Sequence, residues 1–256
     1  MRVCLLASGS KGNAILIDAG SCRILVDAGL SASEVLARLQ SAGYDESQLN
    51  AVIVSHEHTD HVRGVGALCR KLGIPLLASY PTCRELNVSL RKVNVIEFES
   101  GYPFAFRDVM VDPFPVTHDA SDPVGFIIEC RDGKIGIATD FGIATRLVVD
   151  KLKGSKILVL ESNHDENMLL NGPYPWHLKQ RIRSRHGHLS NTESAQLLDE
   201  LIHPELAGLF LAHLSEVNNH PEIAYSTAAV LLQTQNICSP RLVVCQQHAV
   251  SEAIEA

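Results

Sequence analysis

Four side chains that commonly bind metal ions lie within six residues of one another. Residues 51–54 are apolar and resemble a buried strand, and His56, His58, Asp60 and His61 follow where that strand should end. Imidazole and carboxylate are ordinary ligands of Zn²⁺ and also suit Mn²⁺ or Fe²⁺. In a helix, His56 and His58 would point about 200° apart, whereas in an extended turn they share one side and can bind one ion. The pattern therefore predicts a metal-binding loop; the alternative is a polar loop in which Asp60 caps the next helix.

Three more candidate ligands follow apolar runs elsewhere in the chain. His118, Asp140 and His213 each come directly after a predicted strand. Functional side chains recur at the carboxyl ends of strands in α/β sheets. Any one of the three, taken alone, is more simply a loop residue. Together with the loop at residues 56–61, they are expected to converge on one rim.

The loop reads H-x-H-x-D-H, which resembles the defining motif of the metallo-β-lactamase-fold hydrolases. The resemblance implies an α/β fold, a four-layer αββα sandwich of two mixed sheets with outer helices, and two divalent ions, Zn or Mn. It also implies seven ligands: His56, His58 and His118 on the first ion, Asp60, His61 and His213 on the second, and Asp140 bridging both. A bridging carboxylate at Asp140, where zinc β-lactamases usually have a thiolate, indicates a different hydrolase. Two bridged ions suit attack on phosphorus.

Residues around the ligands extend the resemblance. The segments S-G-S-x-G-N and Asp-Ala-Gly are similar to the nuclease-like branch of the fold, in which Asp27 would brace the metal loop; the alternative is a turn aspartate. In RNase Z-like members a strand-terminal glutamate pairs with a helix-start histidine to shuttle protons, and Glu161 and His188 match those positions. The predicted catalytic residues are therefore Asp60, Glu161 and His188, unless His188 only caps the helix. His164 belongs either to the surroundings of the metals and substrate or to an ordinary polar loop.

Residues 179–186 form the one dense basic run in an acidic chain and lead directly to His188. Arg181, Arg183 and Arg185 are predicted to hold substrate phosphates through charge-assisted hydrogen bonds. The alternative is a solvated helix face. The net charge of −7 argues against broad nonspecific binding of nucleic acid and leaves room for a local basic site.

The resemblance is most specific over residues 161–165, 171–175, 187–191 and 212–219. This combination resembles the YycJ/WalJ-type (VicX) branch, which is ribonuclease-Z-like and associated with 5′→3′ exonuclease activity on DNA. A β-CASP nuclease has a large domain inserted after the Asp140 equivalent, but His213 follows after 73 residues. RNase Z-type enzymes have a tRNA-binding arm between the His118 and Asp140 equivalents, which are 22 residues apart here. The chain is therefore expected to form one domain, residues 1–256, that acts on DNA.

The remaining elements predict how the site is built. Two short Gly/Ser-rich loops separate three short strands, which predicts antiparallel hairpins. Strand–helix alternation follows, with a hairpin over residues 125–139 and a final strand near residues 242–245. Helices are expected near residues 31–42, 62–72, 81–90, 192–202 and 222–235.

Composition limits the setting. Apolar residues make up 46% and aromatic residues 5%, which fits an aliphatic layered interior. No apolar run reaches the ~18 residues of a membrane span. Seven cysteines without a C-x-x-C pair indicate reduced, buried thiols in a cytoplasmic protein. The oligomeric state is open, a homodimer included. Three other functions also stay open: a cyclic-nucleotide phosphodiesterase, a non-catalytic regulatory protein of the same fold, and a lactone or thioester hydrolase.

Overall fold

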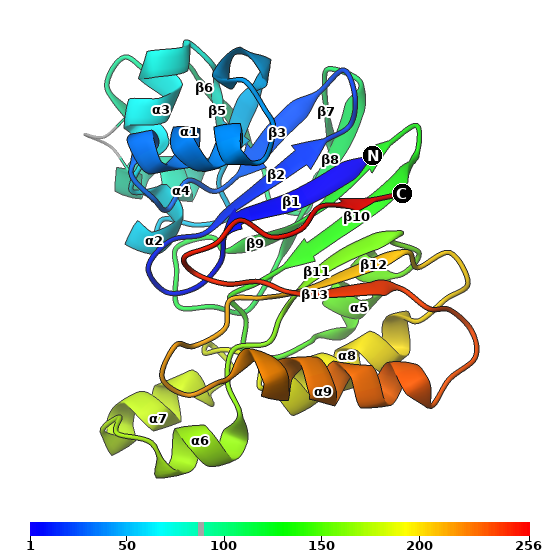
Figure 1. The fold of residues 1–256 in the computed structure, drawn as a ribbon. Coiled ribbons are helices and arrows are strands. Elements are labelled where there is room, and N and C mark those ends of the chain that lie inside the picture. Colours follow the sequence, from blue (N-terminus) through cyan, green and yellow to red (C-terminus); the bar gives the residue numbers. More distant parts are fainter. Residues whose placement is uncertain (87–89) are drawn as a thin grey trace.

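Two β-sheets lie face to face at the centre of the molecule (Figure 1). The computed structural model describes residues 1–86 and 90–256, and within them each sheet has seven strands. The first sheet has the spatial order β14 (Ile254–Glu255), β1 (Arg2–Ala7), β2 (Ala14–Asp18), β3 (Arg23–Val26), β4 (Ala51–Ile53), β5 (Leu76–Ser79) and β6 (Val95–Phe98). The second has β13 (Arg241–Val244), β12 (Gly208–Ala212), β11 (Ile157–Glu161), β10 (Gly133–Ala138), β9 (Val124–Cys130), β8 (Val109–Pro115) and β7 (Phe104–Phe106).

Both sheets are mixed, and each begins antiparallel and continues parallel. Strands β1 to β3 form hairpins, after which β3 to β6 run parallel. Strands β7 to β10 are likewise antiparallel, and β10 to β13 are parallel. Parallel neighbours present their carboxyl ends at the same edge of a sheet, so the loops that follow them can meet there. The late strand β14 returns to pair with β1, with Arg2 opposite Glu255.

Helices cover the outer face of each sheet. On the first sheet lie α1 (Ala32–Ser41), α3 (Val65–Leu72) and α4 (Tyr80–Leu86), with the short helices η1 (Glu46–Gln48) and α2 (Thr59–Val62) nearby. On the second lie α5 (Arg146–Leu152), α8 (Asn191–Leu201) and α9 (Pro221–Gln233), while α6 (Glu166–Asn171) and α7 (Trp176–Ile182) project to one side (Figure 1). One apolar cluster lies between the sheets and one lies under each helical layer. The predicted αββα sandwich is confirmed.

Several predicted helices differ from the structure. The single helix expected over residues 62–72 is two helices, α2 and α3, and Gly64 lies between them, where a Cβ would be 2.3 Å from the carbonyl oxygen of Leu30. The helix expected over residues 81–90 is described as α4, and its residues 87–89 lie outside the described part. Helices α5, α6 and α7 were not anticipated; they have six or seven residues each, too few for a clear helical period.

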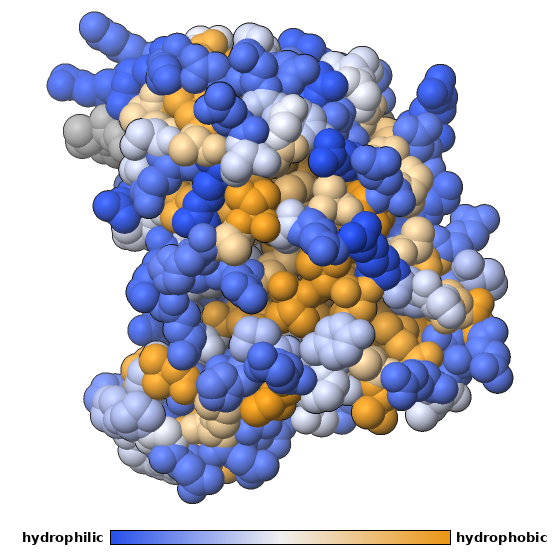
Figure 2. Space-filling model, viewed as in Figure 1, coloured by the Kyte–Doolittle hydropathy of each residue, from blue (hydrophilic) through white to orange (hydrophobic). Residues whose placement is uncertain are grey.

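The cysteines are only partly buried, and one apolar patch lies on the surface. All seven cysteines are free, but only four are buried, so the prediction of uniformly buried thiols was wrong for Cys83, Cys130 and Cys238. Among the described helices none has the length and apolar character needed to span a bilayer. Figure 2 shows apolar residues gathered over β13 and the segment that follows it, where a groove is lined by Leu242, Val244 and others.

Candidate functional site

The predicted ligands meet at one rim of the sandwich. His56 follows β4, His118 follows β8, Asp140 follows β10 and His213 follows β12. These four strands come from both sheets, and their carboxyl ends face the same side. The expected convergence of these distant side chains is therefore present in the fold.

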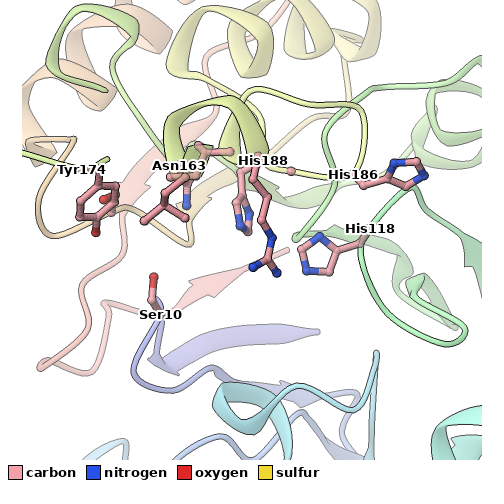
Figure 3. A pocket seen from close by; sticks show the side chains of 11 residues that line it. Ser10, His118, Asn163, Tyr174, His186 and His188 are labelled. Atoms are coloured by element: carbon pink, nitrogen blue, oxygen red, sulfur yellow. The ribbon is translucent and has the colours of Figure 1, made fainter. Parts of the chain in front are cut away.

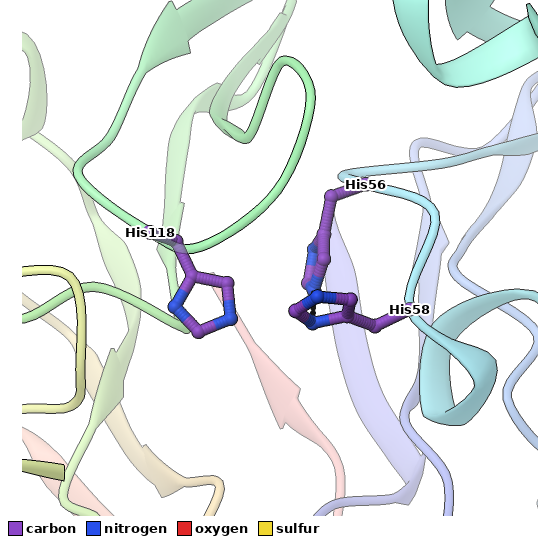
Figure 4. A group of neighbouring side chains, drawn as sticks. All are labelled: His56, His58 and His118. Atoms are coloured by element: carbon purple, nitrogen blue, oxygen red, sulfur yellow. Dashed lines mark hydrogen bonds between the residues drawn. The ribbon is translucent and has the colours of Figure 1, made fainter. Parts of the chain in front are cut away.

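Three imidazoles form the first group (Figure 4). His56 Nε2 lies 3.1 Å from His58 Nδ1, as expected for residues i and i+2 in an extended turn. His118 reaches toward them from the opposite loop, and its ring centroid lies 5.2 Å from that of His56 and 5.1 Å from that of His58. The alternative in which Asp60 caps a helix is wrong, because His58 occupies the N-cap of α2 and no side chain bonds there.

A second group is formed by Asp60, His61 and His213. Asp60 Oδ2 lies 3.6 Å from His61 Nε2 and 3.7 Å from His213 Nε2. Asp140 lies between the two groups: its carboxylate oxygens are 3.4 Å from His61 Nε2, 3.5 Å from His213 Nε2 and 3.9 Å from His118 Nε2. Asp140 is the residue that links the two groups.

These separations suit atoms that share a cation. They are longer than ordinary hydrogen bonds. Two atoms each ~2.1 Å from one tetrahedral zinc ion lie roughly 3.4 Å apart. Asp140 Oδ2 and His213 Nε2 are also buried and have no hydrogen-bond partner among the described residues, and a buried polar atom of this kind is costly without one. The donor set therefore fits divalent metal ions.

Hydrogen bonds behind the imidazoles fix which nitrogen faces the site. Asp27 Oδ2 accepts from His61 Nδ1 at 2.7 Å, and Asp27 also accepts from the backbone N–H and the hydroxyl of Ser55. The hydroxyl of Ser55 lies 2.9 Å from His56 Nδ1. Each of these contacts leaves Nε2 of the histidine directed at the neighbouring ligands. Asp27 thus occupies the bracing position that was predicted for it.

The same environment sets the protonation of the histidines. Burial disfavours the charged form of His56 and holds its pKa well below the usual range. Burial acts in the same direction on His61, but the carboxylates of Asp140 and Asp27 outweigh it and raise the pKa of His61. The pKa of His213 rises to about 10, because Asp140, Asp60 and Glu161 outweigh its burial. The second group thus carries a stronger negative field than the first.

The pattern of this site is shared with proteins of known sequence. Residues 22–210 match the model of the beta-lactamase superfamily domain. Exodeoxyribonuclease YycJ of Bacillus anthracis is 34% identical over 232 residues, which cover 90% of this chain and 88% of YycJ. Exodeoxyribonuclease WalJ of Streptococcus pneumoniae D39 is 35% identical over 228 residues, which cover 87% and 85%. The chain belongs to the YycJ/WalJ family of the metallo-β-lactamase superfamily. The metallo-β-lactamase-fold protein YhfI of Bacillus subtilis has the same fold, with a TM-score of 0.74, 19% identity and 97% of each chain covered.

One residue of this YycJ/WalJ-family site was not singled out from the sequence. Asn13 Nδ2 lies 3.1 Å from His61 Nε2, and the backbone N–H of Asn13 donates to the carbonyl of Asp60 at 2.8 Å. Gly29 packs so closely that a Cβ there would lie 1.6 Å from the same carbonyl. The signal was present in the S-G-S-x-G-N segment, whose last residue contacts the loop at the backbone of Asp60 and at Nε2 of His61.

Glu161 orients two histidines at once. Its Oε1 accepts from Nδ1 of His188 at 2.7 Å and from Nδ1 of His213 at 2.9 Å, while Oε2 accepts from the backbone N–H of Phe141 and Leu189. Burial alone would raise the pKa of Glu161, but His188 and His213 outweigh it and lower the pKa to about 2. Since these four donors occupy both oxygens, Glu161 acts as an orienting carboxylate. One of its oxygens also lies close to candidate ligand atoms of Asp140, His188 and His213.

The predicted pairing of Glu161 with His188 is thus present in the structure. The alternative in which His188 caps a helix is wrong, because Ser190 caps α8 and forms a capping box with Glu193. His164 is buried, and burial lowers its pKa to about 4. Its backbone bridges to Ser190, so it lies behind the segment that carries His188. A role for His164 near the substrate stays a prediction.

A cleft opens beside the ligands, and the basic run meets it only in part (Figure 3). Arg181 lines this cleft together with His118, His186 and His188. Arg183 and Arg185 are exposed and do not line it. Of the three arginines predicted to hold phosphates, Arg181 alone lies beside the candidate ligands.

Proposed function

We propose that this chain is a two-metal phosphodiesterase that removes nucleotides from DNA in the 5′→3′ direction. The observation that carries the proposal is the position of Asp140, whose carboxylate lies between two groups of ligands. The relatives YycJ and WalJ are named exodeoxyribonucleases, which supports DNA as the substrate. The interval from His118 to Asp140 holds the β9–β10 hairpin, which leaves little room for a substrate-binding arm there.

Two groups of side chains would each hold one ion. His56, His58 and His118 would hold one ion, Asp60, His61 and His213 the other, and Asp140 both. When bound, a pair of divalent ions activates water near neutral pH and neutralises charge on the phosphoryl oxygens. Zinc and manganese both suit this set of ligands. Asp60 would hold an ion together with His61 and His213, and its carboxylate would orient the attacking water.

His188 supplies the proton that the departing alkoxide needs. Glu161 holds Nδ1–H of His188, so Nε2 faces the cleft that His188 lines. A buried carboxylate behind an imidazole fixes its tautomer and its orientation, which suits a proton donor. Because Glu161 also holds His213, proton donation and metal binding depend on the same carboxylate.

The proposal extends to the surroundings of the enzyme. Seven free thiols suit a reducing compartment, and we place the protein in the cytoplasm. Arg181 at the mouth of the cleft provides the positive charge that a phosphate requires. We also propose that residues 1–256 form a single domain without a tRNA-binding arm or a β-CASP insertion.

The test uses metal-reconstituted protein and four substrates. These are end-labelled single-stranded DNA, duplex DNA, RNA, and the small ester bis(p-nitrophenyl) phosphate. We expect mononucleotides to be released stepwise from the 5′ end of DNA, and the variant Asp60→Ala/His61→Ala to be inactive on every substrate. Cleavage of the small ester with every polymer intact would contradict the nuclease assignment and favour a phosphodiesterase for small nucleotides. Absence of all turnover with both metals would support a non-catalytic protein.

A further inference from the structure

The cleft beside the candidate ligands has two chemically different ends. It encloses about 250 Å³. Figure 3 shows His118, His186 and His188 toward one end, Tyr174 at the other, and Ser10 across from them. The end with the histidines adjoins the metal ligands, so a phosphate cleaved there would leave the rest of its nucleotide directed along the cleft.

One wall of the cleft is apolar. Leu178 and Ile182, four residues apart, share a face of α7, and Tyr174, which precedes the helix, lines the cleft with them. The wall combines an aromatic ring with two aliphatic side chains. Trp176 lies on a different face of the same helix and is 60% exposed. The aromatic side chain that faces the cleft is therefore Tyr174.

The other end of the cleft suits an anion. Arg181 and His186 stand beside His118 and His188. The guanidinium of Arg181 pairs with Asp119 at 3.0 Å, and both side chains are more than 60% exposed. An exposed ion pair of this kind contributes little, so a phosphate can take the place of Asp119 at low cost.

The loop that carries Tyr174 is held in place by two prolines and by the side chain of Lys179. Residues 173–175 read Pro-Tyr-Pro, and proline on both sides restricts the local φ angles. The buried ammonium of Lys179 donates to the carbonyls of Leu170 and Gly172, each at 2.7 Å. A lysine buried for this purpose fixes the loop before any ligand arrives, and preorganisation of this kind lowers the cost of binding.

We propose that this cleft binds the terminal nucleotide of the DNA strand with its base unpaired and stacked on Tyr174. The inference rests on the proposed function, because the scissile phosphate must lie at the metal ligands. A flat aromatic and aliphatic wall accepts the face of any base, and Arg181 beside it accepts a phosphate. Ser10 and Ser215 also line the cleft, and Ser10 lies opposite the wall that carries Tyr174 (Figure 3).

Opening of the last base pair is therefore part of each cycle on duplex DNA. A terminal mismatch should speed hydrolysis, since the cost of separating the pair has been removed. Single strands should be cleaved without this penalty. On duplex DNA, the identity of the terminal base pair, rather than that of the internal base pairs, should set the rate of hydrolysis.

Variants of Tyr174 test the stacking surface, with Trp176→Ala as the matched control on another face of α7. For Tyr174→Ala we expect kcat/KM on DNA to fall by about 5- to 100-fold, the range for loss of one base–aromatic stack. Turnover of bis(p-nitrophenyl) phosphate, which has no nucleobase, should fall less than turnover of DNA. Tyr174→Phe and Trp176→Ala should match the wild type on both substrates. Equal losses on DNA and the small ester, or no loss on DNA, would overturn the proposal.

A binding experiment separates this inference from the proposed function. DNA with 2-aminopurine at its 5′ end is titrated into wild-type protein held in chelator, so that no hydrolysis occurs. We expect quenching of the terminal base in the wild type and in Trp176→Ala, and none in Tyr174→Ala. Equal quenching in Tyr174→Ala would refute the site. Failure of the metal-loaded wild type to cleave DNA would refute the nuclease function, whereas the quenching experiment would still decide whether the cleft binds a base.

Discussion

Replacement of Glu161 by glutamine isolates the effect of its charge, because the two side chains have nearly the same shape. The carboxylate accepts four hydrogen bonds, two of them from Nδ1 of His188 and His213. An amide can accept on its oxygen only. If the NH₂ group faces the histidines, they must accept at Nδ1 and carry their proton on Nε2, where neither metal binding by His213 nor the proposed orientation of His188 survives.

The magnitude follows from the structure in two ways. A pKa lowered from 4.5 to about 2 means that the folded protein favours the carboxylate by roughly 3 kcal/mol. Charge-assisted hydrogen bonds contribute about 1.5–3 kcal/mol each, and two are lost in Glu161→Gln. We therefore expect the metal-free variant to lose about 3 kcal/mol of unfolding free energy, or about 6–12 °C in Tm for a chain of this size. A catalytic histidine held in the wrong tautomer loses on the order of 10⁴-fold in kcat.

The stability that Glu161 contributes should decrease as the pH falls. Because the pKa of Glu161 is lowered in the folded state, its stabilisation is fully present above about pH 4.5 and is lost as the pH falls toward about 2. Wild type and Glu161→Gln should therefore converge in stability at low pH. The assay combines denaturant unfolding of metal-free protein with hydrolysis of bis(p-nitrophenyl) phosphate, beside the exposed control Glu200→Gln. Equal stability and turnover of Glu161→Gln and wild type at neutral pH would refute the reasoning.

Three further perturbations test the rest of the site. Asp27→Asn removes the charged acceptor behind His61 and should weaken metal binding about 10- to 100-fold in chelator competition; unchanged affinity would contradict the bracing role. Gly29→Ala places a Cβ 1.6 Å from the carbonyl oxygen of Asp60, so the free energy of unfolding measured in urea should fall by more than about 2 kcal/mol. An unchanged free energy of unfolding would show that the loop can move. Burial raises the pKa of Cys69 to about 12, so iodoacetamide at pH 8 should label it only after unfolding, as mass spectrometry can check.

The clustering of the loop side chains could be predicted because its signal is local. A strand followed by His56, His58, Asp60 and His61 has few structural uses apart from ligation. The more distant ligands needed the family resemblance, since a single residue such as Asp140 after a strand is ambiguous by itself. The alternation of strands and helices was enough for the layers of the fold.

Contacts made by the backbone were harder to predict. Asn13 braces the loop through a carbonyl and an imidazole nitrogen, and no spacing rule brings it to His61 across 48 residues. The same limit applies to the basic run: Arg181 and Arg185 differ by about one helical turn, but α7 ends at Ile182, so the later residue follows a different path. Periodicity indicates a face only as long as the helix continues.

Asp27, Asp140 and His213 share a left-handed backbone, with φ of 63°, 58° and 56°. Aspartate and histidine tolerate this conformation better than most residues, whereas a β-branched residue does not. The direction of each side chain is therefore dictated by the main chain and by the sheets that hold it, not by an occupant. We expect a rim of this kind to keep its shape when a chelator removes the ions, and to accept either zinc or manganese when they are returned.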